Sequence, residues 1–168
     1  MAEQNHKRRD LRIIWNANAP NTNSGYAVET RDLLFRLIKD GWPISAVGFY
    51  GVEGFHTFMD GGDLIDDRFK GIKIKVYPKM GDPYGSDALL NHGIDFKAHI
   101  AMSMVDLFVL NPQILQQISQ NKMKFIPWLP IDQEPVQPGI LGNLRFAHKI
   151  LTFSKFGQKA LENEGFTS

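Results

Sequence analysis

Short apolar runs alternate along the chain with amphipathic stretches and with turns rich in Gly, Pro, Asn and Asp. A continuous apolar run that ends in turn residues is typical of a strand buried on both faces. Such runs predict six strands, and they cover residues 11–15, 43–50, 72–77, 99–105, 125–131 and 150–153.

Between these runs, apolar positions recur at the spacing of an α-helix. After Tyr26, the side chains of Thr30, Leu33, Leu34, Leu37 and Ile38 share one face. Gly41 stands where a glycine commonly ends a helix. The other predicted helices are one capped by Ser86, residues 114–118, residues 141–147, and one capped by Ser154 that turns Phe156, Ala160 and Leu161 inward before Gly165.

Alternating strands and helices are the pattern of βαβ units, which pair their strands in parallel. The sequence therefore predicts an α/β fold, a doubly wound, mostly parallel Rossmann-like sheet over residues 11–168, preceded by a polar tail over 1–10. Residues 51–71 show weak periodicity and predict a long loop with one short helical turn. The lysines in run 72–77 favour a strand with one wet face or a strand at an edge.

Composition narrows the classes of function. The 43% of hydrophobic and 22% of charged residues are globular values, and a net charge of +1 gives no general reason to expect nucleic acid as a partner. The absence of cysteine excludes disulfides, thiolate metal sites and a cysteine nucleophile. The five histidines lack zinc-site spacing, so no metal is expected. No run approaches the ~18–20 apolar residues of a membrane span, and without a secretory signal a cytoplasmic protein is expected.

Ligands of open parallel sheets bind beyond the carboxyl ends of the strands, so the residues directly after each strand are the first candidates. Gly25 precedes a helix, where it either lets backbone approach an anion or only shapes the turn. The carboxylates after the strands either act as acid, base or hydroxyl ligands or cap turns. Ser154 is first of all a helix cap. The candidates are Ser24, Gly25, Tyr26, Asp106, Asp132, Glu134, Ser154 and Lys155.

Four stretches carry a family resemblance that spans almost the whole chain. They are Asn16–Pro20 leading into Ser24–Tyr26, then Tyr84–Asp87, then Pro130–Pro138, and finally Leu151–Gly157. On these residues the chain resembles the N-terminal domain of glycosyltransferases with two Rossmann-like domains (GT-B), in particular the large retaining group 1, or family 4.

The resemblance implies one half of a GT-B architecture that binds the acceptor and forms part of the donor-diphosphate cleft. It implies hexosyl transfer from a nucleotide-sugar co-substrate to an acceptor, with retention of configuration and with neither a cofactor nor a metal. On this view Ser24, Gly25 and Tyr26 lie near the diphosphate, and Asp106 and Asp132 are catalytic. Glu134, Ser154 and Lys155 would then contact substrate.

One departure limits this expectation. The family's C-terminal donor domain, with its Glu-x7-Glu motif, is absent from these residues. We therefore expect the chain to be inactive alone, to need the missing domain or a partner half, and to self-associate as a homo-oligomer through its uncovered cleft edge.

Two alternatives stay open. The first is a free-standing nucleotide- or sugar-binding module without catalysis. The second is a Rossmann-like enzyme of another chemistry, although the sequence lacks the G-x-G-x-x-G motif of nicotinamide and flavin sites.

Overall fold

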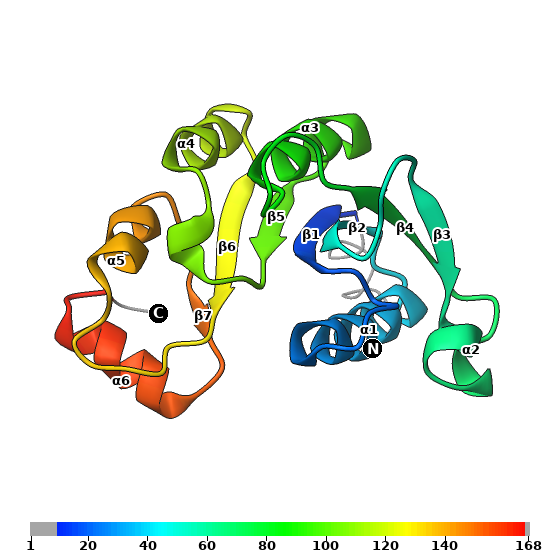
Figure 1. The fold of residues 1–168 in the computed structure, drawn as a ribbon, viewed down its shortest axis with the longest axis horizontal. Helices are drawn as coiled ribbons and strands as arrows, with labels where there is room; N and C mark the ends of the chain where they lie inside the picture. Colours follow the sequence, from blue (N-terminus) through cyan, green and yellow to red (C-terminus); the bar gives the residue numbers. More distant parts are fainter. Residues whose placement is uncertain (1–9, 167–168) are drawn as a thin grey trace.

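A seven-stranded sheet runs through the middle of the molecule in the order β3-β4-β2-β1-β5-β6-β7 (Figure 1). The computed structural model describes residues 10–166, so the predicted polar tail lies outside the described residues apart from the exposed Asp10. The strands are β1 (Ile13–Asn18), β2 (Ile44–Tyr50), β3 (Thr57–Asp60), β4 (Lys73–Pro78), β5 (Ile100–Ser103), β6 (Lys124–Leu129) and β7 (Leu151–Thr152). All neighbouring strands pair in parallel except β3 and β4. The predicted α/β, mostly parallel sheet is confirmed.

Helices cover both faces of this sheet, with α1 on one side and α3 and α4 on the other (Figure 1). The helices are α1 (Gly25–Lys39), α2 (Gly61–Leu64), α3 (Ser86–Phe96), α4 (Pro112–Gln120), α5 (Pro138–Leu144) and α6 (Lys155–Asn163). Two short 3-10 segments are η2 (Asp67–Phe69) and η3 (Leu107–Val109). The chain crosses from one face to the other between β4 and β5, so the strand order reverses between β1 and β5. In doubly wound sheets, ligands bind at such a switch point.

The central position of β1 explains why its first three residues are all apolar. Ile13 and Trp15 pack into the core on the α1 face, and Ile14 packs into the core on the α3 face. All three side chains are buried. A strand with helices on both faces has no wet side, so alternation disappears from its sequence.

Strand β3 was not predicted, and it changes the picture of the sheet edge. It pairs antiparallel with β4 through the register Phe58↔Lys75. The lysine-bearing strand is therefore an inner strand, and the prediction that it could form an edge is wrong. The predicted long loop over 51–71 is also corrected, since it holds β3, α2 and η2. Thr57 and Phe58 are exposed, and a four-residue edge strand with exposed side chains leaves no period in the sequence.

Three predictions about helices are also wrong. Gly85, at a φ of 76°, caps α3 in place of Ser86, whose hydroxyl instead accepts a hydrogen bond from Asn111 N (3.0 Å). Helix α5 starts earlier than predicted, at Pro138, because proline suits a first helical turn. Phe156 is 48% exposed and does not point inward.

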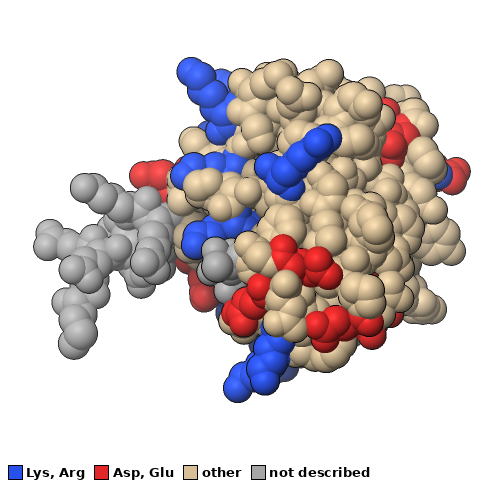
Figure 2. Space-filling view, turned by 90° about the vertical axis from the view of Figure 1, so that its left-hand side faces the viewer, with Lys and Arg blue, Asp and Glu red and all other residues tan. Residues whose placement is uncertain are grey.

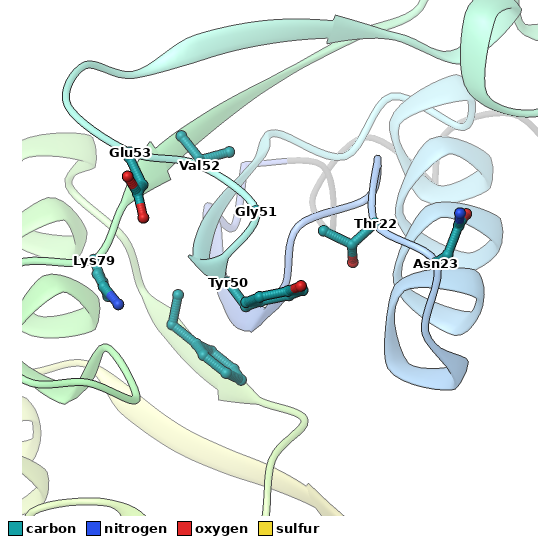
Figure 3. Close-up of a pocket in the computed structure, with 8 residues that line it drawn as sticks. Thr22, Asn23, Tyr50, Gly51, Val52, Glu53 and Lys79 are labelled. Atoms are coloured by element: carbon teal, nitrogen blue, oxygen red, sulfur yellow. The ribbon is translucent and has the colours of Figure 1, made fainter.

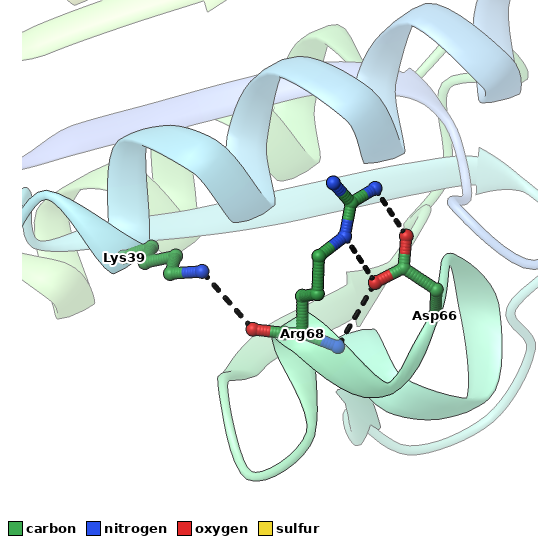
Figure 4. A network of polar contacts seen from close by, with 3 residues as sticks. All are labelled: Lys39, Asp66 and Arg68. Atoms are coloured by element: carbon green, nitrogen blue, oxygen red, sulfur yellow. Dashed lines mark hydrogen bonds and ion pairs between the residues drawn. The ribbon is translucent and has the colours of Figure 1, made fainter.

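A small polar network ties the end of α1 to η2 at the amino edge of the sheet (Figure 4). The guanidinium of Arg68 pairs with the Asp66 carboxylate at 2.7 Å, and Lys39 Nζ donates to the backbone oxygen of Arg68 at 3.1 Å. Hydrogen bonds from the side chain and the backbone N–H of Arg68 lower the pKa of Asp66 to about 2. The carboxylate therefore keeps its charge in this network down to a lower pH than an ordinary aspartate does.

Figure 2 shows one face of the molecule, on which the largest group of acidic side chains lies in the lower part and basic side chains lie both above it and at the lower edge. Neither the acidic nor the basic side chains cover that face. Within residues 10–166, no helix combines the length and the apolar character that crossing a membrane requires.

Candidate functional site

The turn after β1 exposes the start of helix α1. Ser24 caps this helix, since its Oγ accepts hydrogen bonds from Ala27 N (3.1 Å) and from Asn18 Nδ2 (2.8 Å). The first N–H groups of a helix have no partner within it, so those of Gly25 and Tyr26 remain free to bind a ligand. Together with the helix dipole, these groups favour an anion at this position.

Gly25 itself begins the helix and is exposed. Its φ is not in the left-handed region, and a Cβ added here would meet nothing within 4 Å. The backbone conformation therefore does not require glycine, and the alternative that Gly25 only shapes a tight turn loses its support. The missing side chain leaves open space beside the free N–H groups.

The turn between β1 and α1 is fixed against the end of β2. Ala19 N donates to Tyr50 O at 2.9 Å, and Arg31 Nη1 donates back to the oxygens of Pro20 (3.3 Å) and Thr22 (3.4 Å). Gly51 has a φ of +99°, and a Cβ there would lie 2.2 Å from Thr22 Cγ2. The two turns meet at a distance that only glycine allows.

A cavity of about 600 Å³ opens between these turns at the carboxyl edge of the sheet (Figure 3). It lies over the ends of β1, β2 and β4. Its size is that of pockets for small-molecule ligands and nucleotides. The lining residues are Thr22, Asn23, Phe49, Tyr50, Gly51, Val52, Glu53 and Lys79.

The charged and the uncharged polar side chains lie on opposite sides of this cavity. Figure 3 shows Glu53 and Lys79 on one side of the Tyr50 ring and Thr22 and Asn23 on the other. The Tyr50 side chain is 64% exposed, so its ring is available for stacking. The cavity can thus offer a carboxylate to hydroxyl groups, an ammonium to an anion and a flat ring to a base. No group of three or more metal-binding side chains occurs among residues 10–166.

Beside the cavity, three of the sequence-predicted residues come together on the same edge. Burial raises the pKa of Tyr26, and the nearby carboxylates of Asp106 and Asp132 raise it further. Burial also raises the pKa of Asp106, with the charge of Asp132 as the second cause. The Tyr26 ring lies 6.5 Å from that of Phe153 (centroid to centroid). Tyr26, Asp106 and Asp132 therefore lie near one another at the carboxyl edge of the sheet, and their part in a site stays a prediction.

The raised pKa of Asp106 predicts how stability depends on pH. The folded state holds the Asp106 proton more tightly than the unfolded state, so this group's contribution to stability falls as pH rises above the ordinary value of about 4. We expect Asp106→Asn to increase the free energy of unfolding at pH 7 by less than about 1 kcal/mol, because the group is partly exposed. Its side chain makes no cap hydrogen bond that asparagine would lose.

Urea unfolding at pH 7 and at about pH 4 checks this expectation. The gain in unfolding free energy from Asp106→Asn must be smaller at about pH 4, because the Asp106 carboxyl of the native protein then carries less charge. A gain of equal size at both values would rule out the electrostatic cause.

The three remaining sequence-predicted candidates make contacts elsewhere, at or near helix α6. Glu134 is exposed, and its Oε1 accepts from Asn163 Nδ2 at 2.7 Å, near the end of α6. Ser154 caps α6 as predicted, with Oγ accepting from Gly157 N at 3.1 Å. Lys155 is exposed at the first position of the same helix. None of these three lines the cavity described above.

None of the eight residues that line the cavity is among the sequence-predicted candidates, and this holds for the three with the main functional groups, Tyr50, Glu53 and Lys79. Those candidates stand after the first, fourth, fifth and sixth predicted strands, and the ends of the second and third strands contribute none. The rule that ligands bind beyond strand ends, applied to every strand, reaches Glu53 after β2 and Lys79 directly after β4. The signal for these two residues was therefore present in the sequence.

The fold and this edge define a Rossmann-like α/β domain with an open cavity at the carboxyl ends of its strands. No protein-family model matches the chain, and no curated protein matches it significantly. A solved structure that does match is that of a putative NADPH:quinone reductase from Mesorhizobium loti, with 14% identity and a TM-score of 0.39. The match covers 97% of this chain, which spans only 42% of the length of that structure.

These comparisons correct two expectations. The matching structure is named as a reductase and not as a glycosyltransferase, so the assignment to a GT-B glycosyltransferase is wrong. The expectation that no cofactor is bound is contradicted as well, because that protein is named for NADPH. With so low a TM-score and identity, we take no activity for this chain from the match.

Proposed function

We propose that the chain is a nucleotide-binding module of the Rossmann type, which holds a nucleoside diphosphate in the cavity over β1, β2 and β4. The observation that carries this proposal is the cavity itself, about 600 Å³, which joins the start of α1 to the ends of two neighbouring parallel strands. The cavity lies beyond the carboxyl ends of these strands, beside the switch point between β1 and β5, and this edge is where open parallel sheets bind their ligands.

Residues in and beside the cavity offer a group for each part of a nucleotide. The free N–H groups of Gly25 and Tyr26 favour phosphate at the start of α1. Tyr50 offers a ring on which a base can stack. Glu53 can accept hydrogen bonds from ribose hydroxyls, and Lys79 adds a cation at the same end.

Isothermal titration calorimetry with ADP and UDP tests this proposal, with adenosine, inorganic phosphate and glucose as separate titrants. We expect both diphosphates to bind more tightly than adenosine or phosphate alone, because the cavity contacts both halves of the ligand. Lys79→Gln and Glu53→Gln should each weaken ADP binding, the first about tenfold.

Lys73→Gln is the matched control, since Lys73 is an exposed lysine at the opposite end of β4. It should leave the affinity unchanged. Absence of binding by any nucleotide at millimolar concentration, or equal losses in Lys73→Gln and Lys79→Gln, would overturn the proposal. Binding of glucose alone would point to a sugar-binding module.

A further inference from the structure

A second cavity, of about 370 Å³, lies at the opposite edge of the sheet, where β6 begins. It is open to solvent and is bordered by the end of α4, the turn that leads into β6 and the connection between α5 and β7. Its apolar part comes from aromatic, methionine and alanine side chains. Its polar groups are the hydroxyl of Ser119, the ammonium groups of Lys122 and Lys124, and the imidazole of His148.

None of the described residues that line this cavity is acidic. Another cavity, beside η2, differs in this respect. Asp40 lines it, and the charge of its Arg68 is neutralised by Asp66. Around Lys122 and Lys124 no acidic side chain lines the cavity, and the opposing charge is the partial negative charge at the end of α4. The cavity at β6 is therefore the electrostatically stronger place for an anion.

One contact shows how the cationic groups are held. Lys124 Nζ lies 3.1 Å from His148 Nε2. An ammonium only donates, so His148 Nε2 is the acceptor of this hydrogen bond, and further N–H groups of Lys124 remain for a ligand. The backbone N–H of His148 donates to Phe125 O at 2.7 Å, which fixes the connection on the strand.

Lys122 adds a second observation. It follows the last turn of α4 with a φ of 64°, the left-handed conformation in which glycine is the usual residue. A lysine at this position carries a conformational cost that glycine would avoid. Lys122 and Lys124 both line this cavity, and both are exposed.

We propose that the cavity at the start of β6 is a binding site for a phosphate group, separate from the nucleotide cavity. Lysines act as point-charge donors to phosphate, and the Ser119 hydroxyl can add a neutral hydrogen bond. The phosphate can belong to free inorganic phosphate or to a small soluble phosphate ester, which the test distinguishes.

The test is an NMR titration of the ¹⁵N-labelled full chain at constant ionic strength, with inorganic phosphate in one series and glycerol 3-phosphate in the other. We expect saturable shifts of the amide signals of Lys122, Lys124 and His148. The series with the tighter midpoint identifies the source of the phosphate. Lys124→Gln and Lys122→Gln should each weaken binding about three- to fivefold, and Lys124→Arg should restore it.

Lys97→Gln is the control, because Lys97 is an exposed lysine with a φ of 55° at the end of α3. A different structural role for the lysines at β6 would be to offset the dipole at the end of α4. In that case Lys122→Gln would lower the melting temperature without changing the phosphate midpoint, and the proposal would be overturned. Shifts that do not saturate, or equal losses in Lys97→Gln, would also overturn it.

Discussion

Replacing Gly51 with alanine should lower the free energy of unfolding by about 2–4 kcal/mol and abolish nucleotide binding. Two causes add. The φ of +99° is one that alanine rarely adopts, and the new Cβ would stand 2.2 Å from Thr22 Cγ2. Relief of that contact has to turn the Thr22 side chain away from its hydrogen bond to Ala19 O (2.9 Å) or to move one of the two turns, and Thr22 and the end of β2 both line the cavity.

Substitutions of two other glycines separate the effect of backbone strain from that of the steric contact. Gly54 has a φ of +75° and open space around its Cβ position, so Gly54→Ala should cost only the backbone strain of about 1–2 kcal/mol. Gly25→Ala meets neither problem and should leave stability almost unchanged. Chemical denaturation of the three variants gives the comparison. A Gly51→Ala loss no greater than that of Gly54→Ala would show that the two turns do not press against each other.

Asn143→Asp should cost about 3–5 kcal/mol of stability at neutral pH. The Asn143 side chain is buried, and its Nδ2 donates to the backbone oxygens of Leu107 and Leu110, both at 2.9 Å. An ionised carboxylate has no N–H, so its oxygens would face two carbonyl oxygens in a buried place. These bonds join α5 to η3, the segment that begins next to Asp106.

Asn91→Asp is the matched control, since Asn91 is exposed and its Nδ2 donates to a single backbone oxygen, that of Asp87, at 2.8 Å. Urea unfolding should show a loss below about 1 kcal/mol for this variant. The Asn143→Asp loss should also shrink in acid, where the new carboxyl is protonated. Similar losses in the two variants would mean that the hydrogen bonds of Asn143 do not stabilise the contact between η3 and α5.

The sequence predicts most of the fold because most elements bury one clear pattern. The run that became β1 is apolar on both faces, and the face of α1 that holds Thr30 and Leu34 is buried as predicted. Strand β3 could not be predicted in this way, since its pairing with β4 is a long-range property and its exposed Phe58 carries no burial signal. Ser86 was mistaken for a cap because its tertiary bond to Asn111 cannot be seen in local sequence.

The site was predicted less completely than the fold. Strand ends led to Tyr26, Asp106 and Asp132, which the structure brings near one another. Glu53 follows a turn whose shape depends on the contact between Gly51 and Thr22, two residues far apart in the chain. The family resemblance misled because loops that follow parallel strands share Gly, Ser and Asp for general reasons of turn and cap chemistry.

The location of bound nucleotide tests the account most directly. In an NMR titration of the ¹⁵N-labelled chain with ADP, we predict that the amide signals of Gly25, Tyr26 and Gly51 shift together and saturate with one midpoint. Shifts confined to residues outside this edge of the sheet, or no shifts at millimolar ADP, would contradict the assignment of the cavity over β1, β2 and β4 as a nucleotide site.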